Sequence, residues 1–381
     1  MSKLESSHVR FLTLLFVAAM PSLSTWAQDD PWETRTQEGR ASALALVSET
    51  LAGDGFSVRS GEIRFLRMDE EMPDWDTYYG NNPSTPYGWW RVPHLDGEAI
   101  EPDEARGIDQ FRLRPDEAVV FIGRTPPPCR YFSYRSYLYR RQYAPDRSRD
   151  LLGELGEPLN LTRIAPDEPG DGAPFDTQIA VITTASSWLD ERLRSILVAQ
   201  GFPPHRIYTD AIPYPHVRMG LDAAADTFAV LHRSSVFADE DRKEAYLDEP
   251  PAILLRVTPA REMGCRDPFG EPDFIPRGTG TTERALEPSL FRLASAVRSY
   301  YESRLPVTGT IERTAQVGCR MEGVDFIDLG IPTFAPCRDT IYSVGGIGTL
   351  EGSRPDSFLV AVGINHVATG KARYANLSVY D

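Results

Sequence analysis

The feature that most constrains the fold is a strand, helix, strand pattern in the middle of the chain. Gln178 to Thr183 is an apolar run of the length of one buried strand. Ser187, followed three residues later by Asp190, is typical of a helix start, because these side chains can accept bonds from the free N–H groups of the first turn. The predicted helix ends at Gly201, and Ile207 to Ile212 can form the next strand.

Other segments extend this pattern. Thr227 to Leu231 and Ala252 to Val257 read as strands, with a charged helix near Asp239 to Leu247 between them. Pro288 opens a further helix with apolar residues on one face, and Ala41 to Leu51 forms another helix that ends at Gly53. Strands and helices in this order predict an α/β or α+β fold, with a central mixed β-sheet and packed helices.

The region from Gly61 to Gly107 is aromatic, acidic and rich in turns. Tyr78 to Trp90 has five aromatic residues among Gly, Asn and Pro, which excludes a long helix. These aromatics either pack over the core or line a binding cleft, since Tyr and Trp combine a large apolar body with a polar group. The sequence leaves both alternatives open.

Two β-rich stretches share a plan. Ala118 to Ile122 is an apolar strand closed by Gly123, and Arg130 to Tyr139 follows as an aromatic strand. The apolar run Phe358 to Val362 is likewise closed by a glycine, and Arg373 to Tyr380 follows it, which predicts a C-terminal β-hairpin. The two stretches are either a degenerate internal duplication or two unrelated hairpins.

The N-terminus has the features of an export signal. Phe11 to Met20 is apolar, follows Lys3 and Arg10, and precedes a small-x-small site at Thr25-Trp26-Ala27. We therefore expect residues 1–27 to be a signal peptide, and the mature protein to be periplasmic or extracellular. Residues 28–381 are expected to form one globular domain, with an elaborated N-terminal part over 28–117 and the core over 118–381.

The charge limits the partners. The formal net charge of −15 argues against nucleic acid, because phosphate binding requires a positive surface. After processing, no apolar run reaches the roughly 20 residues of a membrane-spanning helix. A small-molecule ligand or substrate is the expected partner, and the sequence makes no prediction about the oligomeric state.

Four cysteines are present in a chain that we expect to be exported, so two disulfides are predicted. We favour Cys319 with Cys337, which would close a short loop, and Cys129 with Cys265. Buried free thiols are the alternative. No C-x-x-C pair occurs, and the chain lacks the G-x-S-x-G and H-E-x-x-H motifs of serine hydrolases and zinc peptidases. Neither a metal nor a cofactor is expected.

The C-terminal loop gathers scarce residue types. Lysine occurs only at positions 3, 243 and 371, and His366 lies five residues before Lys371. Histidine is the usual general acid or base near neutral pH, lysine offers a compact ammonium, and Asn365 could orient the histidine or donate to an oxyanion. These residues form the predicted catalytic group. The alternative is that His366 caps a turn.

A second group of polar residues would bind the substrate. Arginine holds carboxylates and phosphates through paired hydrogen bonds. The predicted binding residues, on the aromatic strand and at the end of a central strand, are Arg130, Tyr131, Arg135, His232 and Arg233. The alternative for each arginine is an ion pair with one of the many acidic residues.

Two functions follow. The first is an exported hydrolase or lyase that acts on a small anionic or carbonyl-bearing substrate, with His366 as acid/base and arginine and lysine anchors. The second is a secreted or envelope-associated binding protein that uses its Tyr/Trp-rich loops. An enzyme requires His366, Lys371 and a further polar group to meet in one pocket. A binding protein would instead expose an aromatic patch.

Overall fold

The computed structural model describes residues 30–67, 82, 85–99, 109–164, 174–306, 315–317, 321–344 and 358–378. By its contacts, the chain forms one unit over Pro31–Asp381, apart from Met1–Asp30.

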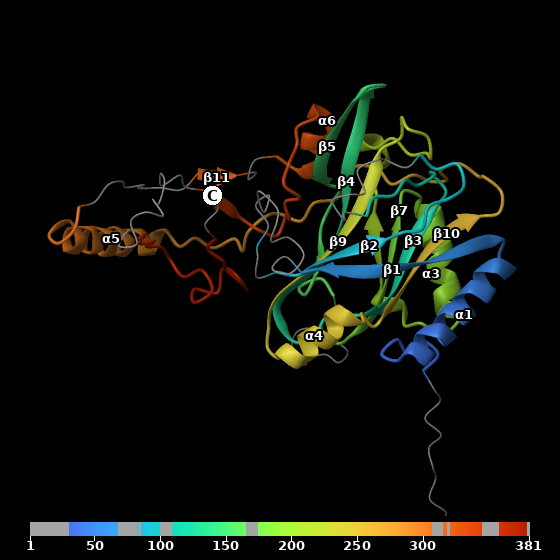
Figure 1. Ribbon diagram of the computed structural model, residues 1–381, viewed down its shortest axis with the longest axis horizontal. Helices are drawn as coiled ribbons and strands as arrows, with labels where there is room; N and C mark the ends of the chain where they lie inside the picture. The colour runs from blue at the N-terminus through green and yellow to red at the C-terminus, as the bar shows by residue number, and fades with distance from the viewer. Residues whose placement is uncertain are drawn as a thin grey trace, which may run out of the picture. The chain divides into compact units, whose positions relative to one another are not determined.

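The centre of the unit is a mixed ten-stranded β-sheet (Figure 1). Its path runs β5-β4-β9-β2-β1-β10-β3-β7-β8, and β6 pairs with β4. These strands are β1 Phe56–Leu66, β2 Tyr87–Arg91, β3 Ala118–Arg124, β4 Cys129–Ala144, β5 Arg147–Glu154, β6 Leu159–Asn160, β7 Gln178–Thr184, β8 Ile207–Ala211, β9 Thr227–Phe237 and β10 Ala252–Pro259, and a separate pair is β11 Ala315–Val317 with β12 Tyr342–Val344. The helices are α1 Gln37–Gly53, α3 Ser187–Ala199, α4 Glu240–Asp248, α5 Glu287–Glu302 and α6 Gly323–Leu329. The predicted mixed sheet with packed helices is confirmed, and the class is α+β.

The strand, helix, strand unit predicted in the middle of the chain is confirmed as β7-α3-β8. Its two strands are parallel neighbours, with Ala180 opposite Ile207, and every other pairing in the sheet is antiparallel. The helix is capped one residue earlier than predicted, because the Ser186 side chain accepts a hydrogen bond from the Leu189 N–H. The second predicted repeat, β9-α4-β10, differs: β9 pairs with β2 and β4, whereas β10 pairs with β1 and β3.

The sheet turns a corner along β1, which belongs to both of its halves. Residues 56–61 of β1 pair with β10, and residues 62–66 pair with β2. Gly61 lies at the change of partner, where an added Cβ would be 2.4 Å from the Arg91 carbonyl oxygen and 3.1 Å from Leu254 Cδ2. Strands that pass from one sheet layer to another turn such corners at bends, and a residue without a side chain permits the close approach.

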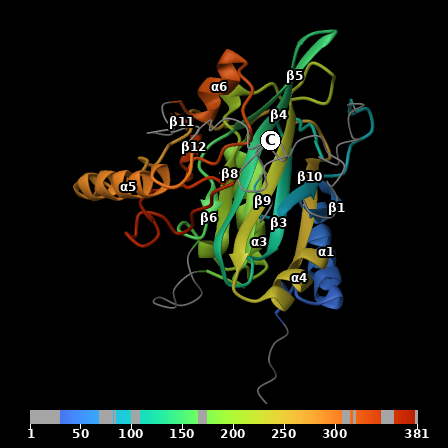
Figure 2. The same cartoon turned by 60° about the vertical axis from the view of Figure 1, so that its left-hand side comes forward.

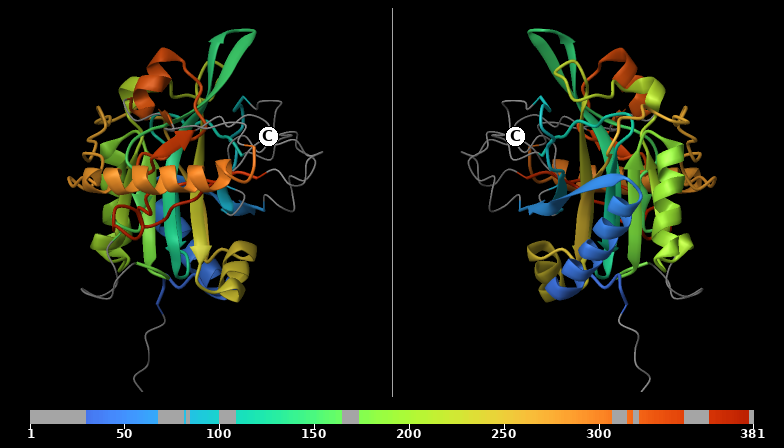
Figure 3. Two further views of the ribbon diagram at one scale, coloured as in Figure 1. Left: turned by 90° about the vertical axis from the view of Figure 1, so that its left-hand side faces the viewer. Right: turned by 90° about the vertical axis from the view of Figure 1, so that its right-hand side faces the viewer.

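The corner brings the two halves of the sheet face to face around a shared core. Trp90 of β2 stacks on Phe121 of β3 with ring centroids 5.4 Å apart, although these strands are not neighbours in the sheet. Tyr134 of β4 also contacts Phe121, at 5.3 Å. On the other side of β3, β7 and β10, helices α1 and α3 bury Val47, Leu51, Leu193 and other apolar residues (Figure 3, right).

A buried ion cluster holds the chain beside this corner. Arg256 of β10 donates to Glu98 at 2.7 Å and to Glu117 at 2.8 Å, and all three side chains are fully buried. The nitrogen that donates to Glu117, Nη2, also donates a hydrogen bond to the carbonyl oxygen of Arg112. Hydrogen bonds from His94 and from backbone N–H groups, together with the Arg256 charge, lower the pKa of Glu98 to about 2 against the effect of burial. Burial of such charges is tolerated because each has several partners.

The aromatic region is a core element where the structure describes it. Tyr87, Trp89 and Trp90 lie on β2 and are all buried. For these three residues, packing in the core is therefore the correct alternative. Tyr78, Tyr79 and Gly80 lie outside the described residues.

The predicted C-terminal β-hairpin is wrong over the residues that the structure describes there. Residues 358–378 contain no strand, and a turn occupies 366–370. The turn is held locally, since Asn365 Oδ1 accepts hydrogen bonds from the backbone N–H groups of Val367 and Ala368. The C-terminal stretch resembles β3 and β4 in sequence, but its described residues do not share their structure. An apolar run becomes a strand only when its backbone pairs with another strand.

The corner at Gly61 generates a prediction. Replacing Gly61 with Ala should lower the free energy of unfolding by roughly 1–3 kcal/mol, because the added methyl overlaps the Arg91 carbonyl oxygen. The matched control is Gly53→Ala at the end of α1, where an added Cβ has no neighbour within 4 Å and stability should stay the same or rise slightly. Urea denaturation of both variants measures the difference, and equal midpoints would contradict this account of the corner.

Candidate functional site

A short segment, residues 333–339, is held across the sheet by hydrogen bonds from several strands, and we call it the strap. The Thr333 N–H donates to the Leu151 carbonyl oxygen at 2.7 Å. Arg233 Nη2 donates to the Ala335 carbonyl oxygen at 2.6 Å, and Tyr137 Oη donates to that of Pro336 at 2.9 Å. The strap is therefore a fixed element although it has no regular secondary structure.

The two long strands β4 and β9 supply the surface beneath the strap, and they run side by side (Figure 2). Side chains alternate between the faces of a strand. Tyr137 and Arg233 consequently face the strap, whereas their neighbours Tyr134 and His232 lie in the core on the other face. At the end of the strap, the Asp339 carboxylate accepts bonds from Tyr131 Oη at 3.1 Å and from Asn160 Nδ2 at 2.6 Å.

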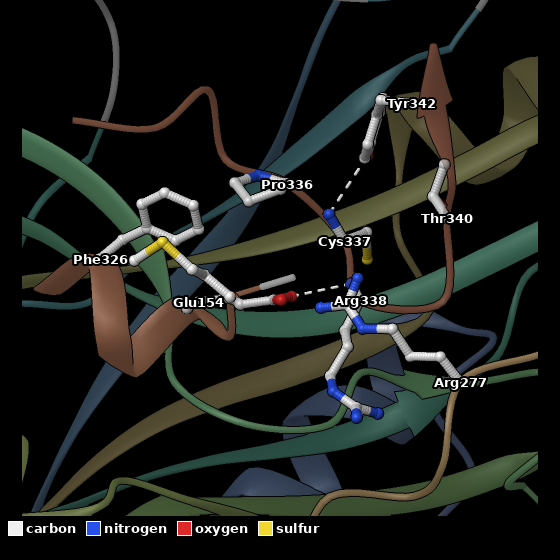
Figure 4. A pocket seen from close by; sticks show the side chains of 10 residues that line it. Glu154, Arg277, Phe326, Pro336, Cys337, Arg338, Thr340 and Tyr342 are labelled. Atoms are coloured by element: carbon white, nitrogen blue, oxygen red, sulfur yellow. Dashed lines mark hydrogen bonds between the residues drawn. The ribbon is translucent and has the colours of Figure 1, made fainter. Parts of the chain in front are cut away.

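A pocket lies between the strap, the end of β5 and the start of α6 (Figure 4). Its empty volume is about 300 Å³, which includes space open to solvent. The lining combines charged, hydroxyl, thiol and apolar groups from separate parts of the chain, namely Glu154, Arg277, Met321, Gly323, Phe326, Pro336, Cys337, Arg338, Thr340 and Tyr342. We call it the strap pocket.

The two arginines of the strap pocket differ in how many partners they have. Arg338 Nε donates to Glu322 at 2.7 Å, and Nη1 donates to the Glu157 carboxylate and to the Ile275 carbonyl oxygen. Arg277 donates to Glu322 at 2.9 Å through Nη2, and in Figure 4 its side chain extends toward Glu154. Arg338 is thus fixed by three groups, and Arg277 is the better placed cation for a ligand.

Glu154 contributes a buried carboxyl group to the strap pocket. Its carboxylate accepts a 2.8 Å hydrogen bond from the Arg338 backbone N–H and is buried. Burial raises the pKa of Glu154 to about 7, and the negative charge of Glu322 acts in the same direction, against the charges of Arg135 and Arg277. A carboxyl group with such a pKa can give or take a proton at neutral pH.

The cysteines are free thiols where the structure describes them. Cys129, Cys265 and Cys337 form no disulfide, so the predicted pairing of Cys129 with Cys265 is not present, and Cys319 lies outside the described residues. The Cys129 thiol instead donates to the Tyr131 carbonyl oxygen, and Cys337 Sγ lies 3.4 Å from Tyr131 Oη. Burial raises the pKa of Cys337 to about 12, so this pocket thiol is a poor nucleophile.

The predicted substrate-binding residues are divided among several environments. Tyr131 and Arg233 contact the strap, and Arg130 is exposed. Arg135 is buried and donates to Asp210 at 3.1 Å, which is the ion-pair alternative for this residue. His232 is buried against Tyr134, and burial lowers its pKa to about 3, so it is neutral at pH 7.

The three predicted catalytic residues lie on one turn, and their hydrogen bonds are not made to these arginines. His366 Nδ1 is 2.7 Å from Glu283 Oε2, and Lys371 donates to the Thr281 carbonyl oxygen. Asn365 caps the turn described above. Among the described residues, these contacts join the C-terminal segment to residues 281–283 and do not include any side chain that lines the strap pocket.

Sequence reasoning did not identify Glu154, Arg277, Arg338 or Tyr342. No local motif marks them, because they come from three segments, around residues 154, 277 and 338–342, that only the folded chain brings together. The one available signal was Cys337-Arg338-Asp339, a charged pair beside a cysteine in a proline-rich stretch. In the described part of the chain, no group of three or more His, Cys, Asp or Glu side chains is arranged to hold a metal, and no helix there has the length and apolarity to cross a bilayer.

The pKa of Glu154 leads to a test by stability. Below pH 4.5 the Glu154 carboxyl is protonated in both the folded and the unfolded chain. Between pH 4.5 and 7 the unfolded chain loses this proton, whereas the folded chain keeps it. The protonated Glu154 therefore stabilises the folded state at low pH, and this contribution to the free energy of unfolding is lost as pH rises through 7. Relative to Glu154→Gln, the wild type should lose roughly 3 kcal/mol of unfolding free energy over this range. If the difference in unfolding free energy between the wild type and Glu154→Gln stays constant from pH 4.5 to 8, the raised pKa of Glu154 is wrong.

Comparison with known proteins gives no family for this chain. No protein-family model and no curated protein matches it. The crystal structure of an uncharacterised protein from Burkholderia cenocepacia is similar over 48% of this chain, with 16% sequence identity and a TM-score of 0.22. The match spans 31% of that chain, about a third of its length. A likeness this low supports no conclusion about fold or function.

Proposed function

We propose that the protein binds a small anion, or the anionic end of a larger molecule, in the strap pocket, and that it is a hydrolase or lyase with Glu154 as its acid/base group. The observation that supports this most is the pairing of a buried carboxyl of pKa about 7 with the Arg277 guanidinium in one pocket. Perturbed pKa values in pockets are typical of catalytic acids and bases. The proposal keeps the predicted substrate class and transfers the acid/base role from His366 to Glu154.

The roles of the side chains follow from their chemistry. Arg277 would hold a carboxylate or phosphate oxygen, and Thr340 and Tyr342 could add hydroxyl hydrogen bonds. In a hydrolysis, water would attack the acyl or phosphoryl centre while the bond to the leaving group breaks. Glu154 would pass its proton to the leaving atom and regain one from the attacking water. Cys337 would take no part as a nucleophile, because its thiol stays protonated.

Export remains part of the proposal and rests on the sequence of residues 1–27 alone. The alternative of a binding protein with exposed Tyr/Trp loops has less support, because Tyr87, Trp89 and Trp90 are buried. Exposed aromatic residues lie elsewhere and are scattered: Phe334 of the strap is 80% exposed, and on α5 Phe291 is 47% and Tyr300 is 54% exposed.

Binding can be tested without knowing the substrate. Inorganic phosphate, acetate and succinate are suitable probes, and binding to the folded state should raise the melting temperature. Arg277→Gln should remove the shift. The matched control is Arg242→Gln, which removes an exposed arginine paired with Asp176 and should leave the shift unchanged. Equal shifts in both variants, or no shift with any probe, would refute anion binding at this pocket.

The acid/base role predicts a pH dependence. As pH rises through about 7, Glu154 becomes negatively charged, so the affinity for acetate, whose own charge does not change near neutral pH, should fall. In Glu154→Gln the affinity should be independent of pH over this range, and hydrolysis of p-nitrophenyl acetate or phosphate, where the wild type shows it, should be lost. Binding that does not change with pH in the wild type would exclude Glu154 as a neighbour of the anion.

A further inference from the structure

Helix α5 (Glu287–Glu302) has an apolar side that is only partly covered, because Leu290 and Val297 are half-buried and Arg304 lies over the Tyr300 ring. The helix has no buried residue, in contrast to α1, α3, α4 and α6, each of which buries apolar side chains. Leu293 is 53% exposed, and Leu286, the residue that precedes the helix, is 40% exposed. Exposed large apolar side chains that lie next to one another are typical of a surface that binds another molecule.

The spacing of the apolar residues identifies the kind of surface. Leu286, Leu290, Leu293, Val297 and Tyr300 follow one another at intervals of four, three, four and three residues. This repeat of 3.5 residues is the seam of a coiled coil, which packs against a second helix with the same repeat. The seam is therefore suited to another helix and not to a small ligand or a strand.

The structure offers one such helix, the α5 of a second copy. The other helices that it describes have their apolar residues buried in their own unit. The positions that flank the seam are mostly small and uncharged, among them Ser289, Ala294, Ala296 and Ser303. Two identical helices could thus approach closely without repulsion between like charges along most of the seam.

The charges at the two ends favour an antiparallel pair. Glu287 lies in the first turn of α5, and Arg298 and Arg304 lie near and just beyond its end. In a parallel pair, the first turns of the two helices, each carrying a Glu287, would lie at the same end of the contact. In an antiparallel pair each Glu287 would lie near an arginine, and the two helix dipoles would also be opposed.

We propose that two copies of the chain associate through antiparallel packing of their α5 helices along the seam from Leu286 to Tyr300. The contact is about four helical turns long, well below the standard protein interface of roughly 1,600 Å². The dimer should therefore dissociate on dilution, with monomer and dimer both detectable as the concentration is varied.

Sedimentation velocity of the full mature protein over a range of concentrations tests the proposal. The wild type should shift from monomer to dimer as the concentration increases, and Leu293→Glu should remain a monomer throughout. The matched control, Ser295→Glu, introduces the same charge on the opposite side of α5 and should dimerise like the wild type. Because α5 has no buried residue, all three proteins should share one melting temperature at low concentration.

Sedimentation tests the dimer and the orientation of its helices separately. A wild type that is monomeric at every concentration, or a Leu293→Glu variant that still dimerises, would overturn the proposal. Orientation has its own test: Glu287→Arg should weaken the dimer by placing like charges together, and adding Arg304→Glu should restore it. If Glu287→Arg leaves association unchanged, the antiparallel arrangement is wrong.

Discussion

The shared strand β1 is the constraint on which the rest of the structure depends. One end pairs with β10 and the other with β2, so the sheet must turn within a single strand. Gly61 permits the turn because any side chain there would meet the Arg91 carbonyl oxygen. The turn brings Trp90 onto Phe121 across the core, and the buried cluster of Arg256, Glu98 and Glu117 holds the adjoining segments in place. A buried ion cluster of this kind adds little net stability, since the cost of desolvation offsets much of the attraction.

The strap pocket is a consequence of that arrangement. Strands β4 and β9 present alternate residues to opposite faces, so Tyr137 and Arg233 bind the strap while Tyr134 and His232 fill the core. Because the strap is fixed over the sheet, Glu154 is removed from water, and its proton affinity rises toward neutrality. The same burial that prepares a carboxyl for acid/base chemistry makes the Cys337 thiol inert and His232 neutral. One physical cause, desolvation, therefore separates the candidate catalytic group from the residues that only look reactive in the sequence.

The proposed pocket and the proposed dimer use different parts of the chain and are independent. The pocket depends on polar groups whose charges are partly paired inside the fold, notably Arg277 and Arg338 with Glu322. The α5 seam depends on apolar groups that are half-buried or exposed in the described part of the unit. A variant at Leu293 should not alter anion binding, and a variant at Arg277 should not alter association.

The sequence by itself determined the local elements. The apolar run at Gln178 and the apolar spacing of α3 and α5 specify a strand and two helices through neighbours a few residues away, and these three elements are confirmed. The cap of α3 is Ser186 and not the predicted Ser187. The C-terminal run at Phe358 has the same local character as a strand, yet it forms none, because a strand also requires a partner that no local pattern encodes. Only the tertiary structure decided the corner at Gly61 and the strap pocket. The pocket joins residues 154, 277 and 337, and the pKa of Glu154 is set by burial, which depends on everything packed around it.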